Sequence, residues 1–88
     1  MNTAFLLMAQ YDGRAIIPAD RVCKDYFPHL TLDTFVRKVA LGEIAIPLVR
    51  IDTGKKAAKG VHLQDLAIYI DKRAEAARKE CRQLTGQW

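Results

Sequence analysis

The clearest functional feature of the sequence is a run of three lysines within five residues, between two glycines. This lysine run consists of Lys55, Lys56 and Lys59, and Arg50 precedes it. Lysines that neutralise phosphates release counterions, which adds nucleic-acid affinity without reading base sequence. The lysine run therefore predicts contact with a phosphate backbone, and a solvated turn is the alternative.

A second group of polar side chains shares one side of a helix expected over residues 32–41. At about 100° per residue, Thr34, Arg37 and Lys38 lie opposite the apolar positions of that helix. An arginine can bond a guanine edge through two hydrogen bonds, and a threonine can touch bases. We expect these residues to contact DNA, with an ordinary solvated helix face as the alternative. Leu41 lies on the same side, and we expect the following hairpin to cover it.

Catalytic and metal chemistry have no candidate residues. The aspartates at 12, 20, 25 and 33 are too scattered to pair for acid–base work, and no glycine-rich phosphate loop, nucleophile elbow or HExxH motif is present. Two distant cysteines, Cys23 and Cys81, and the histidines His29 and His62 lack the spacing of a zinc site. We expect two buried or idle thiols, no metal, no cofactor and no enzymatic activity.

Length and charge point to one small domain with an anionic partner. The chain has 88 residues, of which 50% are hydrophobic and 27% charged, so one core can be built. Its net charge is +4, and the whole excess of lysine and arginine lies after residue 49. A basic surplus favours nucleic acid as the partner. No apolar run is long enough to cross a bilayer and no charged n-region precedes one, so a cytoplasmic protein is expected.

The first half of the chain predicts three short helices. Residues 3–11 are mostly apolar and indicate a helix, with a buried strand as the competitor; a brief extended segment follows at 15–17. A one-sided apolar stripe predicts a helix from Pro18 to Phe27. Thr31 offers an N-cap for the next helix, Leu32 to Leu41, which Gly42 ends. Two short helices joined by a tight linker, the second with a basic outer face, are typical of a helix-turn-helix.

The second half predicts a hairpin and a long helix. Residues 44–51 are rich in β-branched residues and contain Pro47, which indicates an edge strand. The basic loop leads to a second extended segment at 61–63, so the lysine run tips a β-hairpin wing. The last helix is expected over about 64–84. The fold class is α+β and mostly helical, a winged helix-turn-helix in one domain over residues 1–88 with a long C-terminal helix.

The last helix has more apolar surface than one small domain can cover. Its stripe continues through a seam of four residues, Ala74, Ala77, Cys81 and Leu84. A helix of about 20 residues spans about 30 Å, roughly the width of the domain. The seam predicts a partner helix and hence a homodimer, and a frayed soluble helix tail is the alternative.

Four blocks of the sequence together resemble the pyocin activator protein family. They are AFLLMAQYDGRAIIP at 4–18, VCKDYF at 22–27, FVRKVALGEIAIPLVR at 35–50 and KGVHLQDLAIYID at 59–71. The resemblance covers roughly residues 2 to 84. It implies a prophage-type transcriptional activator that binds a box upstream of bacteriocin (pyocin) operons and then recruits RNA polymerase. The pattern GEIAIPLVR followed by VHLQDLAIYI is also similar to the winged helices of excisionases and MerR-type proteins.

Two other functions remain open at this point. An excisionase-like architectural protein would share the fold but bend DNA for recombination. A small adaptor or anti-repressor would instead bind a protein and use its basic face for an acidic partner. The sequence favours the activator, with double-stranded DNA as its main partner and no membrane association.

Overall fold

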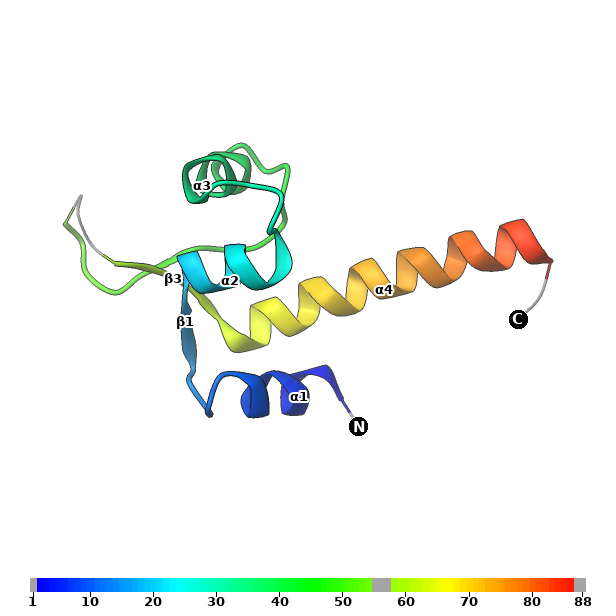
Figure 1. Ribbon diagram of the computed structural model, residues 1–88, viewed down its shortest axis with the longest axis horizontal. Helices are drawn as coiled ribbons and strands as arrows, with labels where there is room; N and C mark the ends of the chain where they lie inside the picture. The colour runs from blue at the N-terminus through cyan, green and yellow to red at the C-terminus, as the bar shows by residue number, and fades with distance from the viewer. Residues whose placement is uncertain (1, 55–57, 87–88) are drawn as a thin grey trace.

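The protein is a mostly helical α+β fold with a small antiparallel sheet. The computed structural model describes residues 2–54 and 58–86. Figure 1 shows the elements in chain order and a last helix that extends well beyond the others. They are α1 (Thr3–Gln10), β1 (Ile16–Pro18), α2 (Ala19–Tyr26), α3 (Leu32–Ala40), β2 (Val49–Arg50), β3 (Lys59–His62) and α4 (Leu63–Thr85). No helix among the described residues is long and apolar enough to cross a membrane.

Local sequence signals account for the helices. The helix expected over residues 3–11 is confirmed as α1, and α2 and α3 lie within the predicted ranges. The hydroxyl of Thr31 caps α3 by accepting a hydrogen bond from the backbone N–H of Thr34, at 3.2 Å. Gly42 adopts a positive φ of 78° just beyond the C-terminal cap of α3, as its position predicts. The last helix extends one residue beyond the expected range at each end.

The sheet differs from the prediction in two respects. Its strand order is β1-β3-β2, so β3 pairs with both neighbours. The segment at 15–17 was expected to be merely extended, but its residues Ile16 and Ile17 belong to β1 and pair with His62 and Val61 of β3. The hairpin partner of β3 is much shorter than the expected strand over 44–51.

Only Val49 and Arg50 of the segment 44–51 form a strand, so the longer prediction is wrong. Ile44 and Ile46 are buried in the core instead, and the backbone N–H of Ile46 bonds locally to the carbonyl of Ile44 at 2.9 Å. Pro47 then lacks an N–H for any ladder. Ile44 and Ile46 therefore serve core packing rather than strand pairing.

Aromatic side chains join the helices around one core. The rings of Phe27 and Phe35 lie 5.0 Å apart between their centroids, and Phe27 lies 5.9 Å from Tyr69 of α4. Tyr11, at the end of α1, is fully buried and donates a hydrogen bond to Asp25 of α2 at 2.7 Å. These contacts fix α2 against α4 and hold α3 in place above α2.

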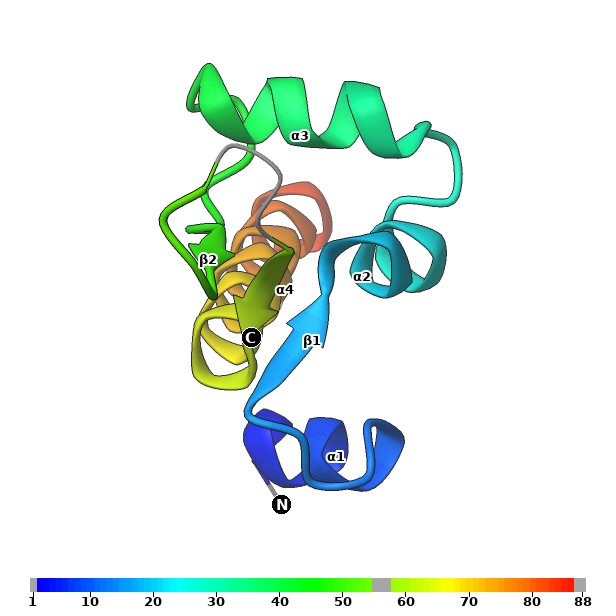
Figure 2. The same ribbon diagram turned by 90° about the vertical axis from the view of Figure 1, so that its left-hand side faces the viewer.

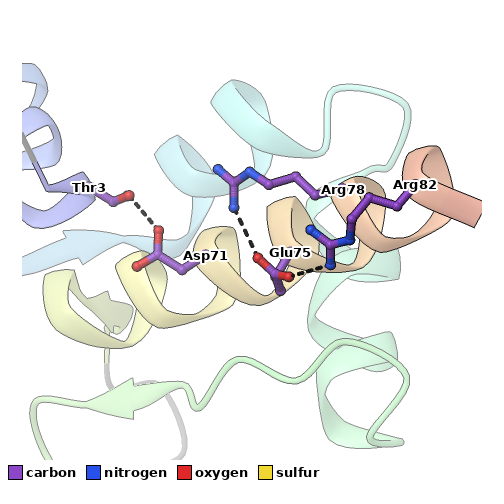
Figure 3. A network of polar contacts seen from close by, with 5 residues as sticks. All are labelled: Thr3, Asp71, Glu75, Arg78 and Arg82. Atoms are coloured by element: carbon purple, nitrogen blue, oxygen red, sulfur yellow. Dashed lines mark hydrogen bonds and ion pairs between the residues drawn. The ribbon is translucent and has the colours of Figure 1, made fainter. Parts of the chain in front are cut away.

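Helix α4 is buried only at its N-terminal end. The Nδ1 atom of His62 caps it by accepting from the backbone N–H of Gln64 at 3.0 Å. Its fully buried residues, Leu63, Leu66 and Ala67, all lie in the first turn and a half. Beyond them the helix runs past the N-terminus of α1 (Figure 1). There the Thr3 hydroxyl of α1 donates a hydrogen bond to Asp71 of α4 (Figure 3).

Candidate nucleic-acid interface

Helix α3 forms one edge of the molecule, at the opposite end from α1 (Figure 2). Its inner side holds Phe35, which is 0% exposed, while Arg37 on the outer side is exposed. The Thr31 cap and the buried ring of Phe35 therefore fix α3 from one side, and Arg37 faces solvent. Ala40, the last residue of α3, is exposed.

Leu41 was expected to be covered by the hairpin, and that prediction is wrong. The side chain is 68% exposed, directly after the last helical residue of α3. It follows Arg37 by four residues, so the two side chains neighbour each other on the helix surface. The outer face of α3 thus presents an arginine beside an apolar side chain, and Asp33 is exposed on the first turn of the same helix.

The other two polar residues predicted to contact DNA from α3 are less exposed to solvent than Arg37. Thr34 is half-buried, and its hydroxyl accepts a hydrogen bond from the Thr31 hydroxyl at 2.9 Å. Lys38 is also half-buried, and its carbonyl accepts from the backbone N–H of Glu43 at 2.9 Å, within the turn that ends the helix. Both residues flank the outer face rather than occupy its centre.

The hairpin places two cations directly opposite each other. Arg50 of β2 and Lys59 of β3 are register partners. Opposed residues of an antiparallel pair project from the same face, and like charges there repel. Arg50 is exposed and Lys59 is half-buried. Lys55 and Lys56 of the lysine run lie outside the described residues.

Arg50 and Lys59 face α3 across a groove. The groove has a volume of about 210 Å³, and α3 contributes Val36, Val39 and Ala40 to its lining. Within residues 2–54 and 58–86 the only ion pairs join Glu75 to two arginines of α4, so neither hairpin cation is neutralised by a carboxylate there. The fold therefore places Arg50 and Lys59 beside α3 with no carboxylate partner in the part of the chain that the structure describes.

The four seam residues of α4 lie along its projecting part. Ala74 and Cys81 are half-buried, Ala77 is exposed, and Leu84 is 80% exposed. On another side of the helix, Glu75 pairs with Arg82 at 3.0 Å and with Arg78 at 3.4 Å (Figure 3). Hydrogen bonds from these arginines lower the pKa of Glu75.

Both cysteines are free thiols in different surroundings. Cys23 is buried in α2, and its Sγ lies 3.4 Å from the carbonyl oxygen of Leu30. Burial raises the pKa of the Cys23 thiol, since the thiolate would lose its hydration. Cys81 is half-buried on α4. Cys23 thus belongs to the core, as expected of an idle thiol.

Comparison with known proteins gives one family. The family model described as Pyocin activator protein PrtN matches residues 3–77. This range includes every described strand and all helices except the C-terminal end of α4. No curated protein and no solved structure matches the chain.

Proposed function

The chain belongs to the pyocin activator protein family, which makes it a regulator of pyocin genes, and from that membership we propose how it acts. It binds double-stranded DNA at a promoter-proximal box through a winged helix-turn-helix, and then recruits RNA polymerase to pyocin (bacteriocin) operons. Helices α2 and α3 are the two helices of the motif, and the β2–β3 hairpin is the wing. No catalytic step is part of this function.

The arrangement of Arg50 and Lys59 beside α3 carries the proposal. Two cations held opposite each other repel, and an anion placed between them removes that cost. A DNA phosphate is such an anion, and its neutralisation releases counterions. Lys55 and Lys56, which lie between Arg50 and Lys59 in the sequence, add two further cations for the DNA backbone.

Helix α3 is the reading element in this proposal. The major groove of B-DNA admits an α-helix, and an arginine recognises guanine through its O6 and N7 atoms. Arg37 is the exposed cation on the outer face, so we assign it the base contact. Leu41 offers an apolar side chain for a thymine methyl group, while Thr34 and Lys38 contact the DNA from the flanks of the helix.

A gel-shift titration tests the proposal with the full-length chain. A pyocin promoter fragment and a scrambled fragment of equal composition are compared at moderate salt, and we expect a shift of the promoter at lower protein concentration. Arg37→Ala should cost about 1–3 kcal/mol on the promoter and less on the scrambled fragment. Arg14→Ala removes the same charge from the exposed turn after α1, at the opposite end of the molecule from α3, and serves as the matched control.

Three results would count against this function. Equal affinity of the wild-type chain for both fragments would refute sequence-specific binding. Equal losses on both fragments with Arg37→Ala would make Arg37 a backbone contact rather than a reader. A loss with Arg14→Ala as large as with Arg37→Ala would show that total charge, and not α3, governs binding.

A further inference from the structure

The apolar stripe of α4 continues beyond the part of the helix that packs against the rest of the protein. Leu66 is buried and Ile70 half-buried, but Ala77 and Leu84 further along the same stripe are exposed. Figure 1 shows the C-terminal half of the helix standing clear of the other elements. At 1.5 Å per residue, the segment from Ala74 to Thr85 is about 18 Å long. This length of apolar stripe has no partner in the chain as described.

An open apolar groove begins where the projecting part of α4 starts. It has a volume of about 290 Å³ and lies between the end of α2 and the side of α4. Its lining residues are Tyr26, Phe27, Leu66, Tyr69, Ile70 and Arg73. The groove thus shares Leu66 and Ile70 with the stripe, so one continuous apolar surface runs from the groove along the helix.

The stripe has the spacing of a coiled-coil seam. Its members from Ile70 onward, at positions 70, 74, 77, 81 and 84, recur at alternating intervals of four and three. An apolar repeat of 3.5 residues packs against a helix with the same repeat. A second copy of this chain carries that repeat together with the groove, so each copy would cover the stripe of the other in a closed, isologous contact.

We propose that α4 pairs antiparallel with α4 of a second copy, and that the C-terminal end of each helix docks against the groove of the other. In such an antiparallel pair, the numbers of any two residues that face each other across the seam add up to the same sum. With Ala74 against Ala77 of the second copy, Ile70 lies against Cys81. Leu84 of the second copy then reaches the level of Ala67, next to Leu66 of the groove.

Charges beside the seam select this register. In an antiparallel pair, like flanks of the two helices face each other. Arg73 then lies beside Glu80 of the second copy, and this pair occurs twice by symmetry. Asp71, which accepts a hydrogen bond from Thr3, lies beside Arg78 of the second copy, which also pairs with Glu75 in its own chain. Sliding the helices by one heptad would bring Glu80 against Glu80 and Arg78 against Arg78. Opposite charges at such flanking positions set partner choice and orientation in coiled coils.

Pairing through α4 also suits the proposed DNA binding, and this one consequence rests on the proposed function. In Figures 1 and 2, α3 lies above α4 and α1 below it. Pairing through α4 brings two copies of α3 into one dimer, and two such helices can read paired half-sites on DNA. The dimer itself does not require DNA.

Sedimentation equilibrium of the full chain without DNA, in reducing buffer, tests the pairing. We expect the wild type to associate at tens of micromolar. Arg73→Glu and Glu80→Arg should each weaken association about tenfold, since two attractive pairs become repulsive. The double variant R73E/E80R restores both pairs and should return to within about threefold of the wild type. Lys79→Glu reverses a charge on the far side of α4 and should have no effect.

A substitution in the seam gives a second measurement. Ala77→Glu buries a charge without a partner and should leave a monomer with unchanged helical content by circular dichroism. A monomeric wild type at tens of micromolar would overturn the proposal. A double variant as weak as the single ones would overturn the register, and association lost equally with Lys79→Glu would overturn the charge pairing.

An interface elsewhere would also be visible. Normal association of Ala77→Glu, together with a monomeric Phe5→Glu, would move the contact to the exposed apolar face of α1 and refute the α4 pair. Because association is measured without DNA, its failure leaves the proposed DNA binding of the monomer standing. A dimer that binds no promoter would refute only the proposed function.

Discussion

Replacing Gly60 by alanine should loosen the sheet that holds the hairpin beside α3. Gly60 is buried in the central strand β3, opposite Pro18 of β1 and Val49 of β2. A Cβ atom on this residue would lie 2.5 Å from Cγ2 of Ile16 and 2.9 Å from the backbone carbonyl oxygen of Ile17. Both distances are shorter than real Cβ contacts, so both neighbours must move.

The two contacts differ in how easily they are relieved. The Ile16 methyl group is the end of a side chain and can rotate away. The Ile17 oxygen belongs to the backbone of β1, which pairs with β3 only over three residues, so the strands must separate there. Overpacking of this kind costs about 1–3 kcal/mol. For a domain of this size, about 4–8 °C of Tm is lost per kcal/mol, so we expect a fall of roughly 4 to 24 °C.

Thermal unfolding followed by far-ultraviolet circular dichroism measures this loss. Gly54→Ala is the matched control, because Gly54 is exposed and a Cβ there meets nothing within 4 Å. The gel-shift affinity of Gly60→Ala, measured well below its Tm, should also fall if the hairpin shifts relative to α3. A wild-type Tm for Gly60→Ala, or an equal loss with Gly54→Ala, would refute the reasoning.

Three further predictions concern the hairpin, the cap of α4 and the thiols. Replacing all three residues of the lysine run by alanine should weaken binding to every DNA sequence alike and reduce the slope of log K against log salt by about 0.9 per lysine; an unchanged slope would show that the run does not touch phosphates. His62→Ala removes the acceptor of the Gln64 N–H and should cost about 1 kcal/mol of unfolding free energy, with His62→Asn recovering most of it, and denaturant titration would contradict this by showing equal midpoints. At a chain concentration well below the tens of micromolar at which α4 is proposed to pair, a thiol reagent should label Cys81 in the folded chain but Cys23 only after unfolding, because Cys23 is buried with a raised pKa; rapid labelling of two thiols per folded chain would be the contrary result.

The sequence by itself determined the helices and the overall class. Helical hydrogen bonds join residues four apart, so apolar spacing, the Thr31 cap and Gly42 specify α3 locally. The same holds for the long stripe of α4, whose length already exceeded what one small domain can cover. The four blocks that resemble the pyocin activator family were likewise visible without coordinates, and the family match confirms them.

Tertiary structure decided what depends on residues far apart in the chain. The β-branched residues at 44–51 suit a strand and a core equally well, and only packing shows that Ile44 and Ile46 enter the core. The pairing of Ile17 with Val61 spans half of the chain, and no local pattern encodes it. The opposition of Arg50 and Lys59 depends on a register set across the hairpin. Sequence patterns report which side of an element is apolar, but long-range packing alone chooses what that side meets.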